Sequence, residues 1–309
     1  MKMMRILFPV TNRVHLARQQ KLLDELQKSF DVHVEKHLLN YKDILNAVAS
    51  SANHFRALLN AERFDLVLIR GDRFEMMPIA MMAVYRGIPI AHIEGGAESG
   101  AHVIDTKIRD AITQLADIHF VTDERAERRV IMLGASPRSV FNVGSLDVSF
   151  ANSVEPKRVK TDGDYVVIAH HAIPGEHTET IAEAVEAATD LEIVGIQSNL
   201  DYAHSLFHEE YSPEDFINLL RYAKCFVSNS SAACKEASIL GVPVVLTGIR
   251  QEGRLAGHNA FRVSHNAEEI KRAVRYQIEH GPYEPDTVYF REDTERYIKE
   301  ILNNYYHEN

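Results

Sequence analysis

The sequence predicts an α/β protein with two doubly wound, Rossmann-like domains that face each other across a cleft. Short apolar runs alternate with longer helical patterns, as in parallel sheets whose strands are buried on both faces and joined by crossover helices. The predicted strands form two series, at residues 6–10, 66–69, 88–93, 118–122 and 140–143, and at residues 165–169, 193–196, 225–228 and 242–246. Helical patterns cover residues 16–30, 104–115, 178–188, 213–221 and 232–240.

A polar stretch without apolar periodicity, residues 151–164, separates the two series and predicts a linker. We therefore expect an N-terminal domain over residues 1–150 and a C-terminal domain over residues 165–292. A last helical pattern at residues 293–309 is expected to pack on the first domain. In open sheets of this kind, ligands bind at the carboxyl ends of the strands.

Composition disfavours several classes of protein for this chain. The chain has 309 residues and a formal net charge of -10, which leaves no basic surplus for nonspecific nucleic-acid binding. Its two cysteines form no disulfide framework, which favours a reducing, cytoplasmic setting. Apolar runs are too short for a membrane span or a signal segment, so no membrane partner is expected.

Two carboxylates stand directly after predicted strands. Asp72 follows residues 66–69 and Glu94 follows residues 88–93, and glycines beside both allow close backbone approach. Asp105 opens a helical pattern four residues before Arg109, so the two share a helix face; an ion pair with a helix cap is an equal alternative for Asp105. Converging carboxylates raise one another's pKa, which lets one act as acid and another as base near neutral pH.

Two adjacent histidines, His170 and His171, end the strand that opens the second domain. An imidazole at a strand end can bind phosphate or shuttle protons, although a structural role is commoner for either one alone. The spacing of histidines and cysteines gives weak support for a metal site, and none is expected. A Gly-x-Gly-x-x-Gly sequence is missing after the first predicted strand, which disfavours a nicotinamide or flavin cofactor.

Hydroxyl groups precede a helical pattern in the second domain. Ser230 and Ser231 lie between residues 225–228 and the helix expected at residues 232–240. Hydroxyls and free amides at a helix N-terminus make an anion site that fits a diphosphate, and an ordinary serine N-cap is the alternative. Glu236, one turn further on, is placed either to accept hydrogen bonds from ribose hydroxyls or to face solvent.

Arginines follow the last and the first predicted strands. Arg250 and Arg254 lie in a glycine-rich loop after residues 242–246, and Arg13 follows residues 6–10. Arginines in such a loop favour phosphate or carboxylate binding over a surface ion pair.

Together these motifs resemble the UDP-N-acetylglucosamine 2-epimerase family, most closely its hydrolysing, sialic-acid-pathway branch, in a shortened form. Five segments in order carry the resemblance: residues 71–75 (GDRFE), 92–96 (HIEGG), 108–113 (IRDAIT), 229–231 (NSS) with Glu236, and 250–254 (RQEGR). The resemblance implies a glycosyltransferase-B-like fold, a UDP-sugar substrate, no cofactor and a homodimer or homotetramer.

In this family a carboxylate removes the proton at C2 while UDP leaves C1, which gives a glycal; hydrolysing members then add water to release N-acetylmannosamine. The resemblance implies the catalytic residues Asp72, Glu94, Asp105, Arg109 and His170. It also implies a UDP site made of Arg13, Asn229, Ser230, Ser231, Glu236, Arg250 and Arg254.

Three alternatives stay open at this point. A non-hydrolysing epimerase would add UDP back and interconvert the two UDP-sugars. A glycosyltransferase of the same fold would not require Asp72, Glu94 and Asp105 to converge. A shortened chain could also serve as a non-catalytic UDP-sugar-binding protein.

Overall fold

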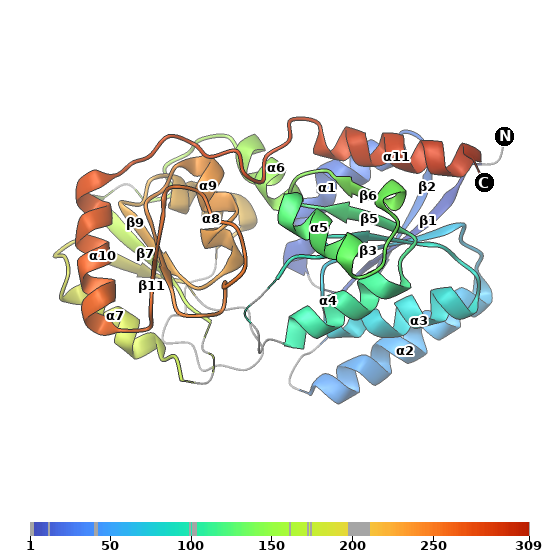
Figure 1. Cartoon of the computed structure of the whole chain (residues 1–309), viewed down its shortest axis with the longest axis horizontal. Coiled ribbons are helices and arrows are strands. Elements are labelled where there is room, and N and C mark those ends of the chain that lie inside the picture. Colours follow the sequence, from blue (N-terminus) through green and yellow to red (C-terminus); the bar gives the residue numbers. More distant parts are fainter. Residues whose placement is uncertain are drawn as a thin grey trace. The chain divides into compact units, whose positions relative to one another are not determined.

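The computed structural model (Figure 1) describes residues 3–11, 13–39, 43–98, 100, 104–160, 162–171, 173, 175–196 and 211–308. The chain divides into two compact units. Unit 1 comprises Met1–Glu98, His102–Leu146 and Arg291–Asn309, and unit 2 comprises Ser99–Ala101 and Asp147–Phe290. Each unit is a doubly wound α/β fold with a parallel sheet, which confirms the predicted fold class.

Unit 1 contains a six-stranded sheet in the order β2-β1-β3-β4-β5-β6, and all of its strand pairs are parallel. The strands are β1 (Arg5–Val10), β2 (Asp31–Lys36), β3 (Leu66–Arg70), β4 (Ile90–Ile93), β5 (Ile118–Val121) and β6 (Val140–Asn142). The helices are α1 (Arg13–Gln27), α2 (Ile44–Ala61), α3 (Met77–Tyr85), α4 (Ile104–Leu115), α5 (Glu124–Met132) and α11 (Thr294–Glu308).

Alternating side chains of the central strands supply a core on each face of this sheet. Ile6 and Phe8 pack with residues of α1 and α11, whereas Leu7 between them packs with residues of α2, α3 and α4. Because both faces are covered, the central strands consist almost entirely of apolar residues. The polar groups of unit 1 therefore gather where the strands end.

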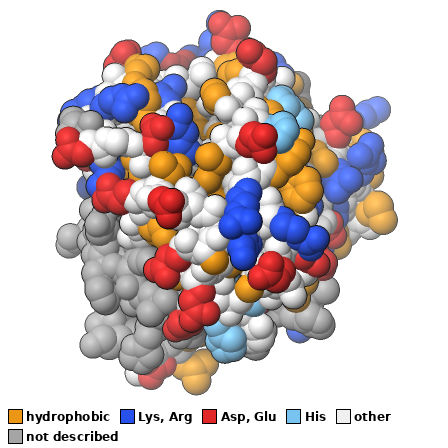
Figure 2. Space-filling model, turned by 90° about the vertical axis from the view of Figure 1, so that its left-hand side faces the viewer, with side chains coloured by type: hydrophobic (Ala, Val, Ile, Leu, Met, Phe, Trp, Pro, Cys, Tyr) orange, Lys and Arg blue, Asp and Glu red, His pale blue; other side chains and the backbone are white. Residues whose placement is uncertain are grey.

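Unit 2 contains a five-stranded parallel sheet in the order β11-β10-β9-β7-β8. Its strands are β7 (Tyr165–Ala169), β8 (Glu192–Gly195), β9 (Cys225–Ser228), β10 (Val244–Thr247) and β11 (Ala260–Val263). Its helices are α6 (Leu146–Ser153), which begins at the boundary between the units, α7 (Thr178–Glu186), α8 (Pro213–Arg221), α9 (Glu236–Leu240) and α10 (Ala267–His280). Figure 2 shows the end of this unit that carries α7 and α10, where acidic and basic side chains are interspersed. Among the described helices, none combines the length and apolar character that a membrane crossing requires.

The sequence-based expectation omits two strands, β2 and β11, and five helices, α2, α3, α5, α6 and α10, and one expected helix differs. β2 and β11 are edge strands whose residues are mostly half-exposed or exposed, so they lack an apolar run. On β2, Glu35 contacts the Nε2 atoms of His33 and His54 at 2.8 and 2.6 Å, which explains its polar sequence. The helix expected at residues 232–240 is instead a 3-10 turn at Ser231–Ala233 followed by the five-residue α9.

His92 of β4 connects the sheet to the loop after β3. Its side chain is fully buried; Nε2 lies 2.8 Å from the Gly71 carbonyl oxygen and Nδ1 lies 3.1 Å from the Thr113 hydroxyl. Because a carbonyl oxygen only accepts, Nε2 carries the proton and Nδ1 accepts from Thr113. Burial lowers the pKa of His92 to about 4, more than the bond to Gly71 raises it. His92 therefore stays neutral and fixes the backbone beside Asp72.

We predict that His92 makes unit 1 sensitive to acid. Its pKa falls from 6.5 unfolded to about 4 folded, so its stabilising contribution is complete above pH 6.5 and is lost as the pH falls toward 4. Between about pH 8 and about pH 5 the wild type should lose about 2 kcal/mol of unfolding free energy through this residue. Urea unfolding of the wild type and of His92→Gln at both pH values measures it. Equal losses in the two proteins would contradict this assignment.

Candidate active site

Asp72 lies in the loop after β3, and its carboxylate accepts a hydrogen bond from Arg109 of α4. Gly71 before it has φ of +79°, a left-handed conformation that glycine adopts without strain. The Arg109 side chain is 6% exposed and also donates to the carbonyl oxygen of Ala97. The structure thus brings together two of the predicted catalytic residues, which lie 37 positions apart in the sequence.

Glu94 directly follows β4 and pairs with Arg70, the last residue of β3. Arg70 Nη2 lies 3.0 Å from Glu94 Oε1. β3 and β4 are neighbours in the sheet, and the Gly71 N–H donates to the Ile93 carbonyl oxygen at 2.9 Å. Asp72 and Glu94 therefore follow adjacent strand ends, each beside an arginine.

Asp105 and Arg13 occupy helix starts in unit 1. Asp105 lies in the first turn of α4, half-buried and one turn before Arg109. Arg13 is the first residue of α1, and its side chain lies outside the described residues.

Sequence reasoning gave no role to Glu75, a fully buried carboxylate of unit 1. Its Oε1 accepts from the Thr11 hydroxyl at 2.6 Å and from Arg73 Nε at 2.5 Å. Thr11 follows β1, so Glu75 ties the loop after β1 to the loop after β3. In the sequence, only its place inside the GDRFE segment pointed to Glu75.

In unit 2, Asn229 holds the ends of two strands together. Its side-chain amide donates to the His171 carbonyl oxygen and its Oδ1 accepts from the His171 N–H, both at 2.8 Å. Its own carbonyl oxygen accepts from Arg250 Nη1 at 3.1 Å and from Gln251 Nε2 at 2.9 Å. The predicted binding residue Asn229 thus links β9 to the end of β7 and to the loop after β10.

Glu176, which the sequence did not single out, fixes the same loop. Its Oε1 accepts from the Ile249 N–H at 2.9 Å, and its Oε2 lies 3.4 Å from the Asn229 amide nitrogen. A Cβ on Gly248 would lie 2.0 Å from Oε1, so the backbone packs directly on the carboxylate. Burial raises the pKa of Glu176, but contacts with His170, Ile249 and Asn229 outweigh it and lower the pKa overall.

Of the two strand-end histidines, His170 is buried and His171 is half-buried. The His170 side chain is 0% exposed, with Nδ1 3.0 Å from the Thr178 hydroxyl and Nε2 3.7 Å from Glu176 Oε2. Burial, with a smaller effect of Arg250, lowers the pKa of His171 to about 3, so this imidazole is neutral. In this conformation the His170 ring therefore contacts protein groups.

His170, Glu176 and His265 offer ligand atoms that lie within 4.8 Å of one another, the spacing of a possible metal site. His265 Nε2, however, accepts from the His177 N–H at 2.9 Å. The proton of a neutral His265 is then on Nδ1, which leaves neither nitrogen a free lone pair. The donor set in this protonation state does not fit a metal.

The α-helix N-terminus expected at Ser230 and Ser231 is a 3-10 turn in the structure. Ser230 precedes this turn and Ser231 is its first residue, so the alignment of peptide dipoles along an α-helix does not support anion binding here. The Ser230 N–H donates to the Ser228 hydroxyl at 2.9 Å. Glu236 opens the short helix α9 and is buried, 1% exposed, which excludes the solvent-facing alternative in this structure.

Arg250 and Arg254 belong to the loop after β10. Arg254 is 9% exposed and its Nη1 donates to Gln251 Oε1 at 2.8 Å. Gln251 also donates to Asn229, so one amide connects Arg254 to the end of β9. Unit 2 thus gathers two guanidinium groups and two serines around the ends of β9 and β10.

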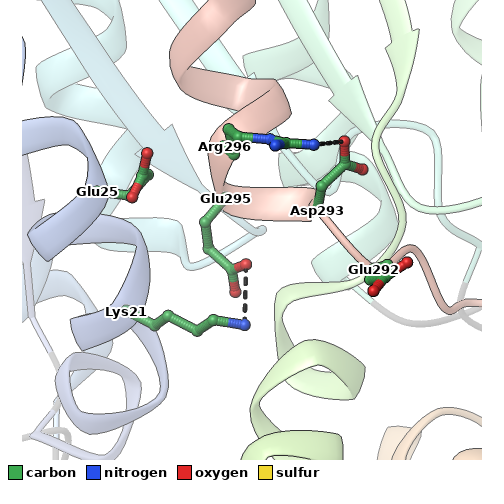
Figure 3. Close-up of a pocket in the computed structure, with 6 residues that line it drawn as sticks. All are labelled: Lys21, Glu25, Glu292, Asp293, Glu295 and Arg296. Atoms are coloured by element: carbon green, nitrogen blue, oxygen red, sulfur yellow. Dashed lines mark hydrogen bonds and ion pairs between the residues drawn. The ribbon is translucent and has the colours of Figure 1, made fainter.

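A separate pocket of about 550 Å³ lies in unit 1 where α1 meets the start of α11 (Figure 3). Its charged side chains pair with each other: Lys21 lies 3.2 Å from Glu295, and Arg296 lies 3.0 Å from Asp293. It is lined by Lys21, Glu25, Glu292, Asp293, Glu295 and Arg296, none of which belongs to the predicted site.

Two curated proteins are similar to this chain in sequence. "Polysialic acid biosynthesis protein P7" of Escherichia coli is 27% identical over 293 residues, which cover 85% of this chain and 74% of the relative. "GDP/UDP-N,N'-diacetylbacillosamine 2-epimerase (hydrolyzing)" of Campylobacter jejuni is 26% identical, with 76% and 70% covered.

Among solved structures, the S. aureus MnaA-UDP co-structure superimposes with a TM-score of 0.81 at 16% identity, covering 99% of this chain and 97% of that one. Identity this low shows a shared fold only. The sequence model described as UDP-N-acetylglucosamine 2-epimerase matches residues 11–303. Since that match spans nearly the whole chain, the protein belongs to the UDP-N-acetylglucosamine 2-epimerase family.

Proposed function

We propose that this protein is a hydrolysing UDP-N-acetylglucosamine 2-epimerase, which converts UDP-N-acetylglucosamine and water into N-acetylmannosamine and UDP. A carboxylate takes the C2 proton while the C1–O bond to UDP breaks, which leaves a glycal. A proton then returns to C2 from the opposite face, and water adds at C1. Family membership and the hydrolysing name of the Campylobacter relative support this reaction.

The observation that carries the proposal is the pair of arginine–carboxylate contacts after β3 and β4. The proton at C2 is weakly acidic, so its acceptor must be charged and held in place. Asp72 beside Arg109 and Glu94 beside Arg70 meet both requirements. We assign Asp72, Glu94 and Asp105 as the acid/base set, with Arg109 positioning Asp72.

We assign the nucleotide to unit 2. The departing diphosphate needs cationic groups, and the loop after β10 supplies two arginines on a backbone that Glu176 and Asn229 hold. His170 is a positioning residue here, because its enclosed ring contacts Thr178 and Glu176. The proposed UDP contacts in unit 2 are Asn229, Ser230, Ser231, Glu236, Arg250 and Arg254.

We infer that the reaction uses neither cofactor nor metal, because elimination and addition of water are both redox-neutral and the leaving group is already a diphosphate. We also infer that the protein is cytoplasmic, which its two buried cysteines, both free thiols, support. We further infer a homodimer or homotetramer, which family membership supports. Light scattering on a sizing column measures the oligomeric state.

Proton NMR in deuterated water tests the reaction. With UDP-N-acetylglucosamine, we expect free N-acetylmannosamine with deuterium at C2, together with UDP. UDP-N,N'-diacetylbacillosamine is the second substrate to include, given the name of the Campylobacter relative. A deuterated mixture of two UDP-sugars would instead identify a non-hydrolysing epimerase. Tight UDP binding without C2 exchange on either sugar would indicate a non-catalytic binding protein.

We predict that Glu176→Ala weakens UDP binding about tenfold or more. The substitution leaves the Ile249 N–H without its acceptor, which costs about 1–3 kcal/mol. Each 1.4 kcal/mol of this cost that appears in the binding free energy raises the dissociation constant for UDP about tenfold. Glu176→Gln keeps an acceptor oxygen and should lose less. Isothermal titration calorimetry with UDP measures both.

The matched control is Glu179→Ala, three positions away on the exposed face of α7, with wild-type UDP affinity expected. Circular dichroism establishes that all variants are folded. Wild-type affinity in a folded Glu176→Ala protein would refute the role of this carboxylate.

A further inference from the structure

Arg70 forms a buried ion pair with Glu94 in the proposed catalytic site. The guanidinium and carboxylate side chains, 3.0 Å apart, are only 7% and 14% exposed. A carboxylate removed from water to this extent costs several kcal/mol unless a partner compensates for the lost hydration. The guanidinium of Arg70 therefore stabilises a charged Glu94 at this position.

The backbone aims Glu94 toward this partner. Arg70 and Ile93, the last residues of β3 and β4, are partners in the sheet register. Glu94 then adopts φ of 67°, the one positive φ recorded for a non-glycine residue in the described part of the chain. Such a conformation costs about 1–3 kcal/mol and is found mostly at functional sites. Strand pairing, a 2.8 Å hydrogen bond from the Glu94 N–H to Phe120, and the ion pair hold it.

Other carboxylates on the surrounding elements have partners of their own. Asp72 pairs with Arg109 of α4, and Glu75 pairs with Arg73. Asp123, which follows β5, accepts from two backbone N–H groups as the cap of α5. Each of these carboxylates therefore keeps a partner when the guanidinium of Arg70 is removed.

The pH dependence due to Glu94 can be distinguished from that of the other titratable groups near the strand ends. Burial lowers the pKa of His92 to about 4 and also lowers that of His119, its register partner on β5. The His92 imidazole is thus neutral in mildly acidic solution. Asp105, in the first turn of α4, is the other carboxylate to control for.

We propose that Arg70 is a positioning residue that holds Glu94 as an anion, so that Glu94 is the proton acceptor of the reaction and not the group that returns a proton to C2. The inference rests on the proposed function. Glu94 takes the C2 proton, the C2–H electrons form the C1–C2 double bond, and the C1–O electrons leave with UDP. The protonated carboxyl beside a cation is unfavourable, which drives release of the proton before the next turnover.

The test is the pH dependence of kcat/KM for Arg70→Met and Arg70→Lys. Without the guanidinium, Glu94 is protonated at higher pH, so in Arg70→Met the acidic limb should move up by about one to two pH units. The plateau kcat should fall about tenfold or more because orientation is lost, while UDP affinity and KM stay within about twofold. Arg70→Lys keeps the charge, so its acidic limb should stay near that of the wild type.

Two controls make the result specific. Arg129→Met removes another guanidinium of unit 1, which pairs with Asp110 and Glu98, and should leave the acidic limb unchanged. Asp105→Asn establishes whether that limb belongs to Asp105, and a limb that disappears in Asp105→Asn overturns the assignment to Glu94. If Arg70→Met does not fold, Arg70→Lys still decides: an acidic limb shifted upward despite the retained charge would overturn the proposal.

The outcomes separate this inference from the proposed function. If the wild type produces no C2 exchange, the proposed function is wrong, and so is this inference. An active wild type and an Arg70→Met variant with an unshifted acidic limb overturn the inference alone. Equal losses of UDP affinity and kcat in Arg70→Met would also overturn it, because they indicate a general structural role.

Discussion

A carboxylate buried in a protein must have a partner, and this requirement organises the polar parts of both units. In unit 1, Asp72, Glu94 and Glu75 contact Arg109, Arg70 and Arg73 respectively. Each unpaired charge would cost several kcal/mol of desolvation. The Asp72 and Glu94 pairs join segments far apart in sequence, so compensating the charge also fixes the loops that follow β3 and β4. A parallel sheet places all these loops at one edge, which is why charged groups can meet there while the strands themselves stay apolar.

In unit 2, Glu176 meets the same requirement mainly with neutral donors. Glu176 accepts from the Ile249 backbone and lies near the Asn229 amide, and Asn229 in turn binds the backbone of His171. The difference between the units fits the proposed division of the reaction. Proton transfer at a sugar carbon needs charged carboxylates held in one orientation, whereas a diphosphate needs a rigid loop that carries cations.

The central strands could be predicted because burial on both faces makes them continuous apolar runs, as in β3 and β9. β2 and β11 could not, since an edge strand keeps polar residues on its exposed side. The segment after Ser231 has helical spacing, yet it forms a 3-10 turn and a short helix. Asp72 and Glu94 could be proposed because each follows a visible strand beside glycines. Arg70 and Glu176 escaped notice because their importance comes from partners 24 and 73 positions away, which only folding brings near.

We propose that the two units divide the reaction, with proton transfer in unit 1 and nucleotide binding in unit 2. The most direct measurement determines UDP affinity by calorimetry and C2 exchange by NMR for one variant of each unit. Asp72→Asn should abolish C2 exchange and leave UDP affinity within about twofold of the wild type. Arg250→Met should weaken UDP binding about tenfold or more, since it removes a charge-assisted contact. An Asp72→Asn protein that still exchanges the C2 proton, or one that loses UDP affinity as strongly as Arg250→Met, would contradict this division.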